Sequence, residues 1–254
     1  MSPLLSVTRL EVRFGGVVAI GGVSFDVPQD ALLGLIGPNG AGKTTAMRAI
    51  TGVVRPDQGE ITLSGERLTG LPTHRRVRLG LGLSQQLVRP FKAMTVEENV
   101  MIAAGYRKTK GPLGALTTLE RESERDRAHE LLTLVGIGHV AKASPTELPL
   151  GFLKRLEVAR ALALDPKLLL LDEPLAGLTS GEASALADTV VALNDGGLTI
   201  VLIEHNLSEV MRVCSHLVVL DNGRKIGDGA PQTVMADPAV RAAYLGEGAD
   251  DAAA

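Results

Sequence analysis

The sequence is poor in cysteine and in aromatic residues. Its 254 residues include one cysteine, no tryptophan, two tyrosines and four phenylalanines. A single cysteine, Cys214, excludes an internal disulfide and any metal centre built from several cysteines. It stands among apolar positions of an expected helix, so we expect a buried thiol.

Long apolar runs and an excess of charge are also missing. No apolar stretch approaches the ~18 residues of a membrane span, and Met1 to Arg9 lack the layout of a signal peptide. The net charge is −3, so the chain has no general bias towards nucleic acid. With 45% apolar residues it is long enough to bury a substantial core. We expect a globular cytoplasmic protein that reaches a membrane only where another chain holds it there.

A glycine-rich loop stands where an apolar strand over 32–36 is expected to give way to a helix over 44–50. It fits the pattern G-x-x-x-x-G-K-[ST], known as Walker A. Glycines let the backbone close round a phosphate with its N–H groups inward. Lys43 then reaches the β- and γ-phosphates, and Thr44 offers a hydroxyl to Mg²⁺. The predicted nucleoside triphosphate site consists of Gly37, Pro38, Asn39, Gly40, Ala41, Gly42, Lys43, Thr44 and Thr45.

Strand and helix patterns alternate at both ends of the chain, whereas the middle is helical. The early segments 4–14 and 17–27 indicate a hairpin, and the fully apolar strands over 168–171 and 199–203 are typical of a parallel sheet covered on both faces. We predict an α/β fold with a P-loop NTPase core, whose sheet is doubly wound and mainly parallel. The core is assigned to 1–90, which includes an antiparallel β subdomain, and to 165–254, and an α-helical subdomain to 91–164.

Three further helices are expected from their patterns. The segment Leu71 to Arg78 carries three arginines, interpreted as a solvated face, with a phosphate or lipid head-group site as the alternative. The helix over 116–135 pairs Glu122 with Arg125 and Glu124 with Arg127 at i,i+3 spacing, which indicates an exposed face. A single helix is expected over 231–245.

Polar residues follow three other expected strands, where ligands gather in open α/β sheets. Asp172 is placed to hold Mg²⁺, and Glu173 to polarise the attacking water. His205 is predicted to contact the γ-phosphate. Gln86, or else Gln85, offers a neutral amide to Mg²⁺ and water. The catalytic candidates are therefore Glu173, His205, Lys43 and Gln86, and the metal candidates are Thr44, Gln86 and Asp172.

Together these residues resemble the ATP-binding subunits of ABC transporters over nearly the whole chain. The motifs come in the family's order: Walker A, the glutamine loop at Gln86, the signature Leu148-Pro149-Leu150-Gly151-Phe152, Walker B through Asp172-Glu173, the loop Ala176-Gly177-Leu178-Thr179 and the switch His205. The resemblance implies one ABC ATPase domain over 1–254 that hydrolyses ATP with Mg²⁺. It also implies that two subunits close head to tail on two ATP molecules, each signature capping the other subunit's Walker A, to drive a permease.

The signature departs from the family's LSGGQ. Pro149, Leu150 and Phe152 replace its serine, first glycine and glutamine, so the serine hydroxyl is missing. Gly151 remains, as does the N-terminus of a helix expected over 153–164, which still offers N–H groups to an anion. Thr179 stands where many members carry aspartate. Weaker or more partner-dependent turnover is expected.

Four stretches resemble the ATPase subunits of branched-chain amino acid importers and of related urea or amide importers: Arg13-Phe14-Gly15-Gly16, Met94 to Asn99, Leu202 to Asn206 and Ala243 to Gly246. The residues alone leave Phe14 either in the core or stacked on the base, and the resemblance implies adenine stacking. It also implies a peripheral location on the cytoplasmic face of the inner (plasma) membrane. The implied partners are integral-membrane permease subunits, a second ATPase subunit, identical or paralogous, and indirectly a solute-binding protein, with no nucleic acid.

Other functions stay open. The ATPase of the lipopolysaccharide exporter shares the Tyr-Leu-Gly ending at 244–246, so lipid export is the alternative within the family. Alternatives of another class are a soluble P-loop phosphotransferase and a non-transport ABC clamp.

Overall fold

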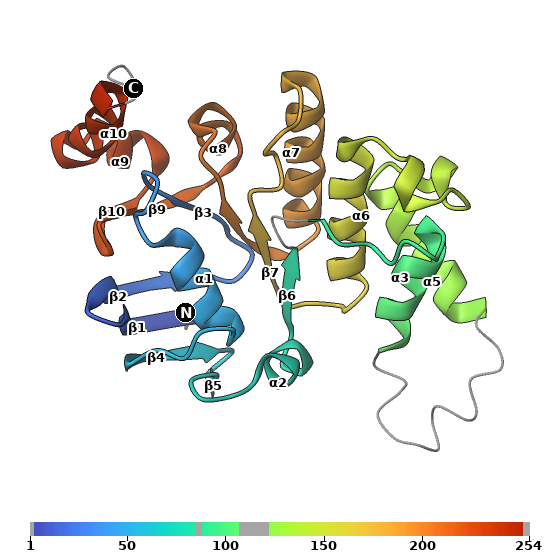
Figure 1. Cartoon of the computed structure of the whole chain (residues 1–254), viewed down its shortest axis with the longest axis horizontal. Coiled ribbons are helices and arrows are strands. Elements are labelled where there is room, and N and C mark those ends of the chain that lie inside the picture. Colours follow the sequence, from blue (N-terminus) through green and yellow to red (C-terminus); the bar gives the residue numbers. More distant parts are fainter. Residues whose placement is uncertain (1–2, 85–87, 107–121, 251–254) are drawn as a thin grey trace.

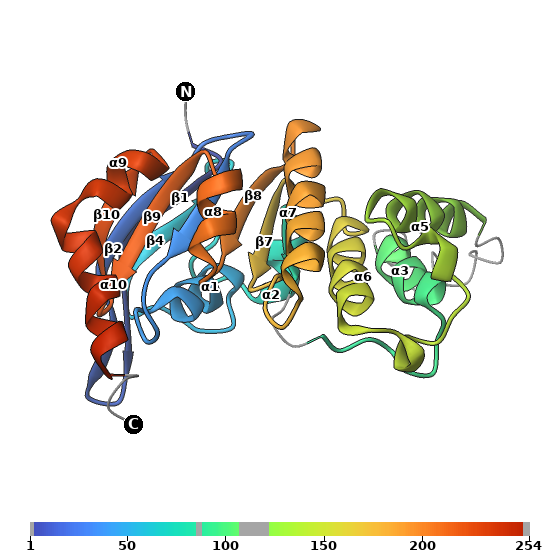
Figure 2. The same ribbon diagram turned by 90° about the horizontal axis from the view of Figure 1, so that it is seen from above.

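The computed structural model describes residues 3–84, 88–106 and 122–250, with the backbone alone for 245–250. Two sheets and their covering helices form one part of the molecule, and a group of helices lies at the opposite end (Figures 1 and 2). Within the described ranges no helix is long and apolar enough to cross a membrane.

The larger sheet has six strands in the order β10-β9-β3-β8-β7-β6. All its neighbours are parallel except the hairpin of β9 and β10. The smaller sheet is antiparallel, in the order β2-β1-β4-β5. The strands are β1 (Leu5–Phe14), β2 (Val17–Val27), β3 (Leu32–Ile36), β4 (Gln58–Leu63), β5 (Glu66–Arg67), β6 (Leu81–Ser84), β7 (Leu168–Asp172), β8 (Thr199–Ile203), β9 (His216–Asp221) and β10 (Arg224–Gly229). The predicted fold class, a mainly parallel sheet with an antiparallel β part, is confirmed.

Helices cover the six-stranded sheet on both faces. On one face lie α7 and α8, and on the other lie α1 and the antiparallel sheet (Figures 1 and 2). Helices α3, α5 and α6 pack on one another at the far end. The helices are α1 (Lys43–Thr51), α2 (Thr73–Arg78), α3 (Val96–Gly105), α5 (Glu122–Leu134), α6 (Leu150–Leu162), α7 (Ser180–Asp195), α8 (Leu207–Val213), α9 (Pro231–Ala236) and α10 (Pro238–Asp250), with short 3₁₀ turns at Gly138–Val140 and Pro145–Glu147.

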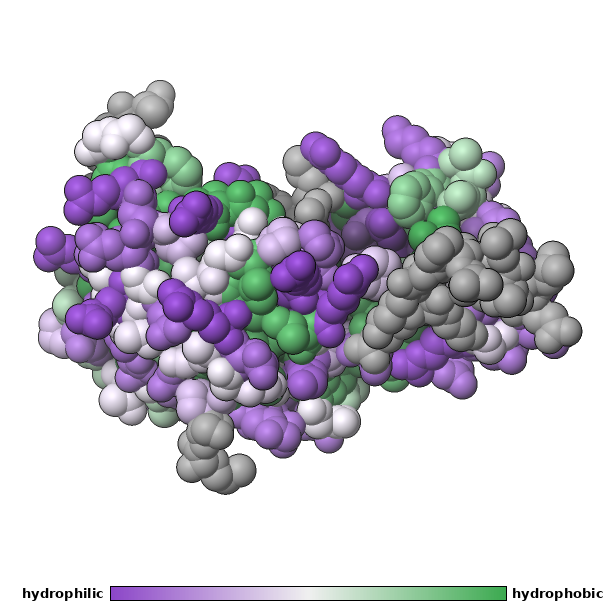
Figure 3. Space-filling view, turned by 90° about the horizontal axis from the view of Figure 1, so that it is seen from below, coloured by the Kyte–Doolittle hydropathy of each residue, from purple (hydrophilic) through white to green (hydrophobic). Residues whose placement is uncertain are grey.

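The core forms two apolar layers, one on each face of the larger sheet. Successive side chains of a strand point to opposite faces, so Leu168 and Leu170 of β7 lie in one layer and Leu169 and Leu171 in the other. All four are buried. This two-sided burial explains why the interior positions of β7 and β8 are apolar without alternation. Seen from below, hydrophilic side chains cover most of the surface and apolar residues show in smaller patches (Figure 3).

Arg76 of α2 is buried, contrary to the solvated face expected for all three arginines of this segment. Its guanidinium donates hydrogen bonds to the main-chain oxygens of Ala49 at 2.6 Å, Ile50 at 2.7 Å and Leu71 at 2.9 Å. The first two belong to the last turn of α1, where carbonyls have no i+4 partner within the helix, and Ala49 also accepts from the N–H of Gly52 at 3.3 Å. Burial lowers the pKa of this guanidinium. Of the three arginines on this helix, only Arg75 and Arg78 are exposed.

The charges of α5 also differ from the expected i,i+3 pairs. Glu124 is buried, Arg127 pairs with Glu130 at 3.0 Å, and Arg125 lies 3.4 Å from Glu97 of α3. A different i,i+3 pair within α5 and one contact with α3 therefore take the place of the expected pairs.

The helix expected over 231–245 is two helices. The chain breaks at Asp237, which is extended with φ −64° and ψ 125°, and α10 begins at Pro238. Proline disfavours the helical conformation of the residue before it, which accounts for the break. Cys214 is 7% exposed as expected, and burial raises the pKa of its thiol to about 12.

Candidate functional site

Four parallel strands bring the predicted site residues to one edge of the sheet. β8 pairs with both β3 and β7, so that Ile203 lies opposite Leu35 on one side and Asp172 on the other. The loops that follow these three strands therefore emerge side by side. β6 adds the fourth end, since Ser84 pairs with Leu171. Gln85 and Gln86 come next in the chain but lie outside the described residues.

The phosphate loop needs glycine at Gly37 and Gly42. Gly37 has φ 146°, and a Cβ there would lie 2.0 Å from the main-chain oxygen of Leu220. Gly42 has φ 104°, and its Cβ would lie 2.6 Å from the Ile20 side chain. Neither position has room for a side chain, because the loop lies close against β9 at Gly37 and against β2 at Gly42.

Lys43 begins α1 and is almost fully buried, with 7% of its surface exposed. Its ammonium group donates to the main-chain oxygens of Gly37 at 2.5 Å and Pro38 at 2.8 Å. The helix has Gly42 at its N-cap, with no side chain to cap it. The loop thus presents a fixed cation beside the N-terminus of a helix, a combination that suits an anion.

Asp172 ends β7 and is 5% exposed. Burial, reinforced by the neighbouring Glu173, raises the pKa of Asp172 to about 6, although Arg48, Lys154 and Lys43 act against the shift. Its Oδ1 atom is buried without a hydrogen-bond partner among the described residues. A buried carboxylate oxygen without a partner is costly unless a cation compensates it. The donor chemistry here fits a hard divalent cation such as Mg²⁺.

Glu173 follows in a left-handed backbone conformation with φ 47°. A non-glycine residue in this region is strained, and such strain concentrates at functional sites. The N–H of Glu173 donates to the oxygen of Ile203 at 2.9 Å, and its own carbonyl accepts from Nζ of Lys154 at 2.9 Å. The main chain at this acid is therefore bonded on both sides.

Glu204 and His205 follow β8 and have opposite environments. Glu204 is fully buried, and one oxygen of its carboxylate accepts from the N–H of Leu175 at 2.7 Å. Burial raises its pKa, while the Leu175 hydrogen bond and His205 act against the shift. The side chain of His205 is 60% exposed, with Nδ1 3.9 Å from the other oxygen of Glu204. The histidine is thus available to a ligand, whereas Glu204 ties β8 to the loop after Glu173.

The five signature residues lie at the start of α6. Pro149 is the N-cap and supplies no side-chain hydrogen bond, and the helix begins at Leu150, three residues before its expected start. Phe152 packs edge-on against His139, with ring centroids 5.6 Å apart. Gly151 is buried, and a Cβ on it would lie 3.0 Å from Glu182 of α7. The N–H groups of this first turn therefore have no serine to cap them.

Comparison with known proteins agrees with this geometry. The chain matches the family described as ABC transporter over residues 20–176 and the family described as branched-chain amino acid ATP-binding cassette transporter over residues 224–250. It is 39% identical to the high-affinity branched-chain amino acid transport ATP-binding protein BraF of Pseudomonas aeruginosa, over 96% of this chain and 98% of BraF. The chain belongs to the ABC transporter ATP-binding family. Its activity is ATP hydrolysis coupled to transport.

An export ATPase and a solved cassette structure are also similar to this ABC ATPase. The lipopolysaccharide export system ATP-binding protein LptB of Haemophilus influenzae is 35% identical, over 96% of this chain and 98% of LptB. The crystal structure of the ADP conformation of an ATP-binding cassette from an ABC transporter superposes with a TM-score of 0.85 and 30% identity, over 97% of this chain and all of the other. The fold is therefore that of a nucleotide-binding cassette throughout.

Phe14 lies outside the core of this ABC ATPase. It ends β1, pairs with Val17 across the hairpin and is 50% exposed. The adjoining strand β2 approaches the phosphate loop, because the oxygen of Ala19 would lie 2.9 Å from a Cβ on Gly42. The core alternative for Phe14 is thus wrong, and the ring is left exposed on the hairpin that flanks the loop.

Two charged residues of the site, Glu204 and Lys154, belong to none of the motif positions that the sequence indicates for the site. Glu204 directly follows the apolar strand β8, which is a weak signal, whereas Lys154 stands among other charged residues of α6 and has no such signal. Both are buried beside the strand edge, where each contacts the main chain of the segment after β7.

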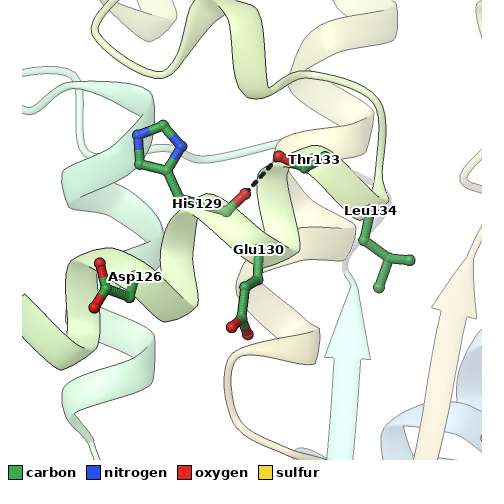
Figure 4. A pocket seen from close by; sticks show the side chains of 5 residues that line it. All are labelled: Asp126, His129, Glu130, Thr133 and Leu134. Atoms are coloured by element: carbon green, nitrogen blue, oxygen red, sulfur yellow. Dashed lines mark hydrogen bonds between the residues drawn. The ribbon is translucent and has the colours of Figure 1, made fainter.

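A hollow on α5 lies apart from this site. It is lined by Asp126, His129, Glu130, Thr133 and Leu134, all from the one helix. Their side chains spread along the helix, and the Thr133 hydroxyl donates to the His129 carbonyl at 2.8 Å (Figure 4). Across the described residues no three histidine, cysteine or acidic side chains are grouped to hold a metal ion. The strand edge therefore remains the candidate site.

Proposed function

We propose that this ABC ATPase energises an importer of branched-chain or related amino acids. The observation that carries the proposal is the match of β10, α9 and α10 to the branched-chain amino acid transporter family over 224–250. The name of the 39% identical BraF supports the same solute class. The proposed partners are integral-membrane permease subunits, a second ATPase subunit, identical or paralogous, and indirectly a solute-binding protein. The proposed location is the cytoplasmic face of the inner membrane, without nucleic acid as a partner.

The nucleotide is proposed to bind along the strand edge. The phosphates occupy the loop from Gly37 to Thr45, where Lys43 and the first turn of α1 supply positive charge. Phe14 stacks on the adenine, which its exposure on the hairpin permits. Thr44, Asp172 and Gln86 are the proposed ligands of Mg²⁺, which neutralises phosphate charge when bound with the nucleotide.

Hydrolysis is proposed to depend on positioned groups. Glu173 accepts a proton from the attacking water, and the fixed main chain on both sides of it holds the carboxylate beside the γ-phosphate. His205 contacts the γ-phosphate from the neighbouring strand end. Lys43 stabilises the charge that develops on the transferred group, and Gln86 orients the water.

The signature residues Leu148, Pro149, Leu150, Gly151 and Phe152 are proposed to cap the nucleotide of a second subunit, by head-to-tail closure of the dimer. The uncapped N–H groups at the start of α6 support this proposal. Leu150 is 42% exposed there, which suits contact with a partner. Phe152 packs against His139 of its own chain, so the contact relies on the backbone of α6 more than on side chains.

Lipid export is the second candidate within the family, on the strength of the 35% identity to LptB. The names of BraF and LptB both describe transport proteins, which favours a transporter over a soluble phosphotransferase or a non-transport clamp. An exporter and an importer would have different membrane partners, and purification can identify these partners.

The deciding experiment is affinity purification of tagged Glu173→Gln protein from native membranes in mild detergent with ATP, followed by mass spectrometry. We expect two permease subunits, a second ATPase subunit and a solute-binding protein, which can then be titrated with leucine, isoleucine, valine and urea. Lys43→Ala protein is the control, because it should not form the ATP-closed assembly. Recovery of export components would overturn the importer, and recovery of no membrane protein would leave only the ATPase activity.

A further inference from the structure

Lys154 is the buried cation whose hydrogen bond restrains the main chain at Glu173. It lies on α6, four residues after Leu150, and is 5% exposed. A charged side chain is rarely buried to this degree unless it is paired. Burial lowers the pKa of Lys154, and four carboxylates oppose this shift, those of Glu204, Glu173, Asp172 and Glu157. The ammonium group is thus influenced by the acids at the ends of β7 and β8 and by Glu157 of its own helix.

Lys154 donates a hydrogen bond to the main chain of Glu173. Nζ lies 2.9 Å from the carbonyl oxygen of Glu173, the residue with φ 47°. The N–H of Glu173 is bonded to the oxygen of Ile203. A left-handed non-glycine residue persists only where its surroundings hold it. Restraints on this conformation come from β8 and from α6.

The neighbouring cation on α6 has other partners. Arg155 donates to the oxygen of Val135 at 2.8 Å and to the hydroxyl of Thr189 at 3.0 Å. It is partly buried, and burial lowers its pKa as it does for Lys154. The contact with the segment after β7 is therefore a property of position 154 and not of every cation on the helix.

We propose that Lys154 is a positioning residue for hydrolysis, tying α6 to the main chain of Glu173 and so aligning that carboxylate with the attacking water. The inference rests on the proposed role of Glu173. The signature turn at Leu150 and Lys154 lie one helical turn apart on the same helix. A shift of α6 when its first turn meets a nucleotide therefore moves the ammonium group and, through it, the acid of the same chain. The ammonium also reduces the repulsion among the surrounding carboxylates.

The test compares Lys154→Met, Lys154→Arg and the matched control Arg155→Met by kcat, KM for ATP, affinity for a fluorescent ATP analogue and thermal unfolding. A misplaced reacting group of this kind costs about ten- to a hundredfold in rate. We expect that loss of kcat for Lys154→Met, with KM and analogue affinity within about twofold of wild type, and recovery of most of the rate in Lys154→Arg. Arg155→Met should lower the unfolding temperature without a comparable loss of kcat per folded molecule.

Two outcomes would overturn the proposal: a kcat for Lys154→Met equal to that of the control, or a loss of nucleotide affinity as large as the loss of rate. Glu173→Gln, measured in parallel, separates this from a failure of the underlying mechanism. Undiminished hydrolysis in Glu173→Gln would remove the role of Glu173 itself. An inactive Glu173→Gln beside a fully active Lys154→Met would remove only the role of Lys154.

Discussion

The ammonium nitrogen of Lys43 lies 2.5 Å from the main-chain oxygen of Gly37, and this hydrogen bond closes the phosphate loop on itself. A second bond, to the oxygen of Pro38 at 2.8 Å, holds the same group. The lysine is thereby fixed within the loop, so little side-chain freedom remains to be lost when phosphate oxygens replace the carbonyls.

Lys43→Ala removes this cation, and we expect ATP binding to be abolished. The measurement is equilibrium binding of a fluorescent ATP analogue. Arg48→Ala is a matched control, because Arg48 is an exposed cation on the same helix. Normal affinity in Lys43→Ala would remove the phosphate-loop assignment.

At high pH the ionised Asp172 makes the folded wild-type chain less stable than the Asp172→Asn variant, whose side chain stays neutral. The pKa of Asp172 is raised by burial from 3.8 to about 6, so the folded chain binds this proton more tightly than the unfolded chain does. The unfavourable contribution is absent below about pH 4, grows as the pH rises and is complete above about pH 6. Urea unfolding of wild type and Asp172→Asn without Mg²⁺ should show the wild type losing stability relative to the variant over that interval. A difference independent of pH would contradict the assignment.

Pro149→Ser restores a hydroxyl at the N-cap of α6. The present backbone, with φ −58° and ψ 157°, suits a capping serine. We expect basal ATP hydrolysis to rise, while unfolding free energy changes by less than about 1 kcal/mol, since a new cap offsets the loss of proline rigidity. Steady-state hydrolysis by purified protein is the measurement. No change in rate would mean that the hydroxyl stays bonded to its own helix or is already compensated.

Arg76→Met should destabilise the chain by about 2 to 4 kcal/mol, because three buried main-chain oxygens lose a charged donor. The matched control is Arg75→Met, an exposed arginine on the same helix, expected to change stability by less than about 0.5 kcal/mol. The free energy of unfolding from urea titration decides between them. Equal effects would show that the caps on α1 contribute little.

Local sequence was sufficient to predict the fold class and the kinds of residue at the proposed nucleotide site. The glycine positions, the apolar strands and the acids after them follow rules of period and of backbone freedom that act within a few residues. The division of the chain at 91 and 164 and the roles of Gln85 and Gln86 stay predictions.

The surroundings of charged side chains were decided by tertiary structure. Arg76 and Arg75 are neighbours with the same chemistry, yet one is buried against the end of α1 and the other is exposed. Lys154 and Arg155 are likewise neighbouring cations, yet Lys154 bonds to the main chain of Glu173 and Arg155 bonds to that of Val135. The sequence determined the fold class and the pattern of a phosphate loop between strand and helix, where the nucleotide is proposed to bind. Which charges hold that site in place depends on contacts between segments far apart in the chain, and only the packing of helices on the sheet brings those together.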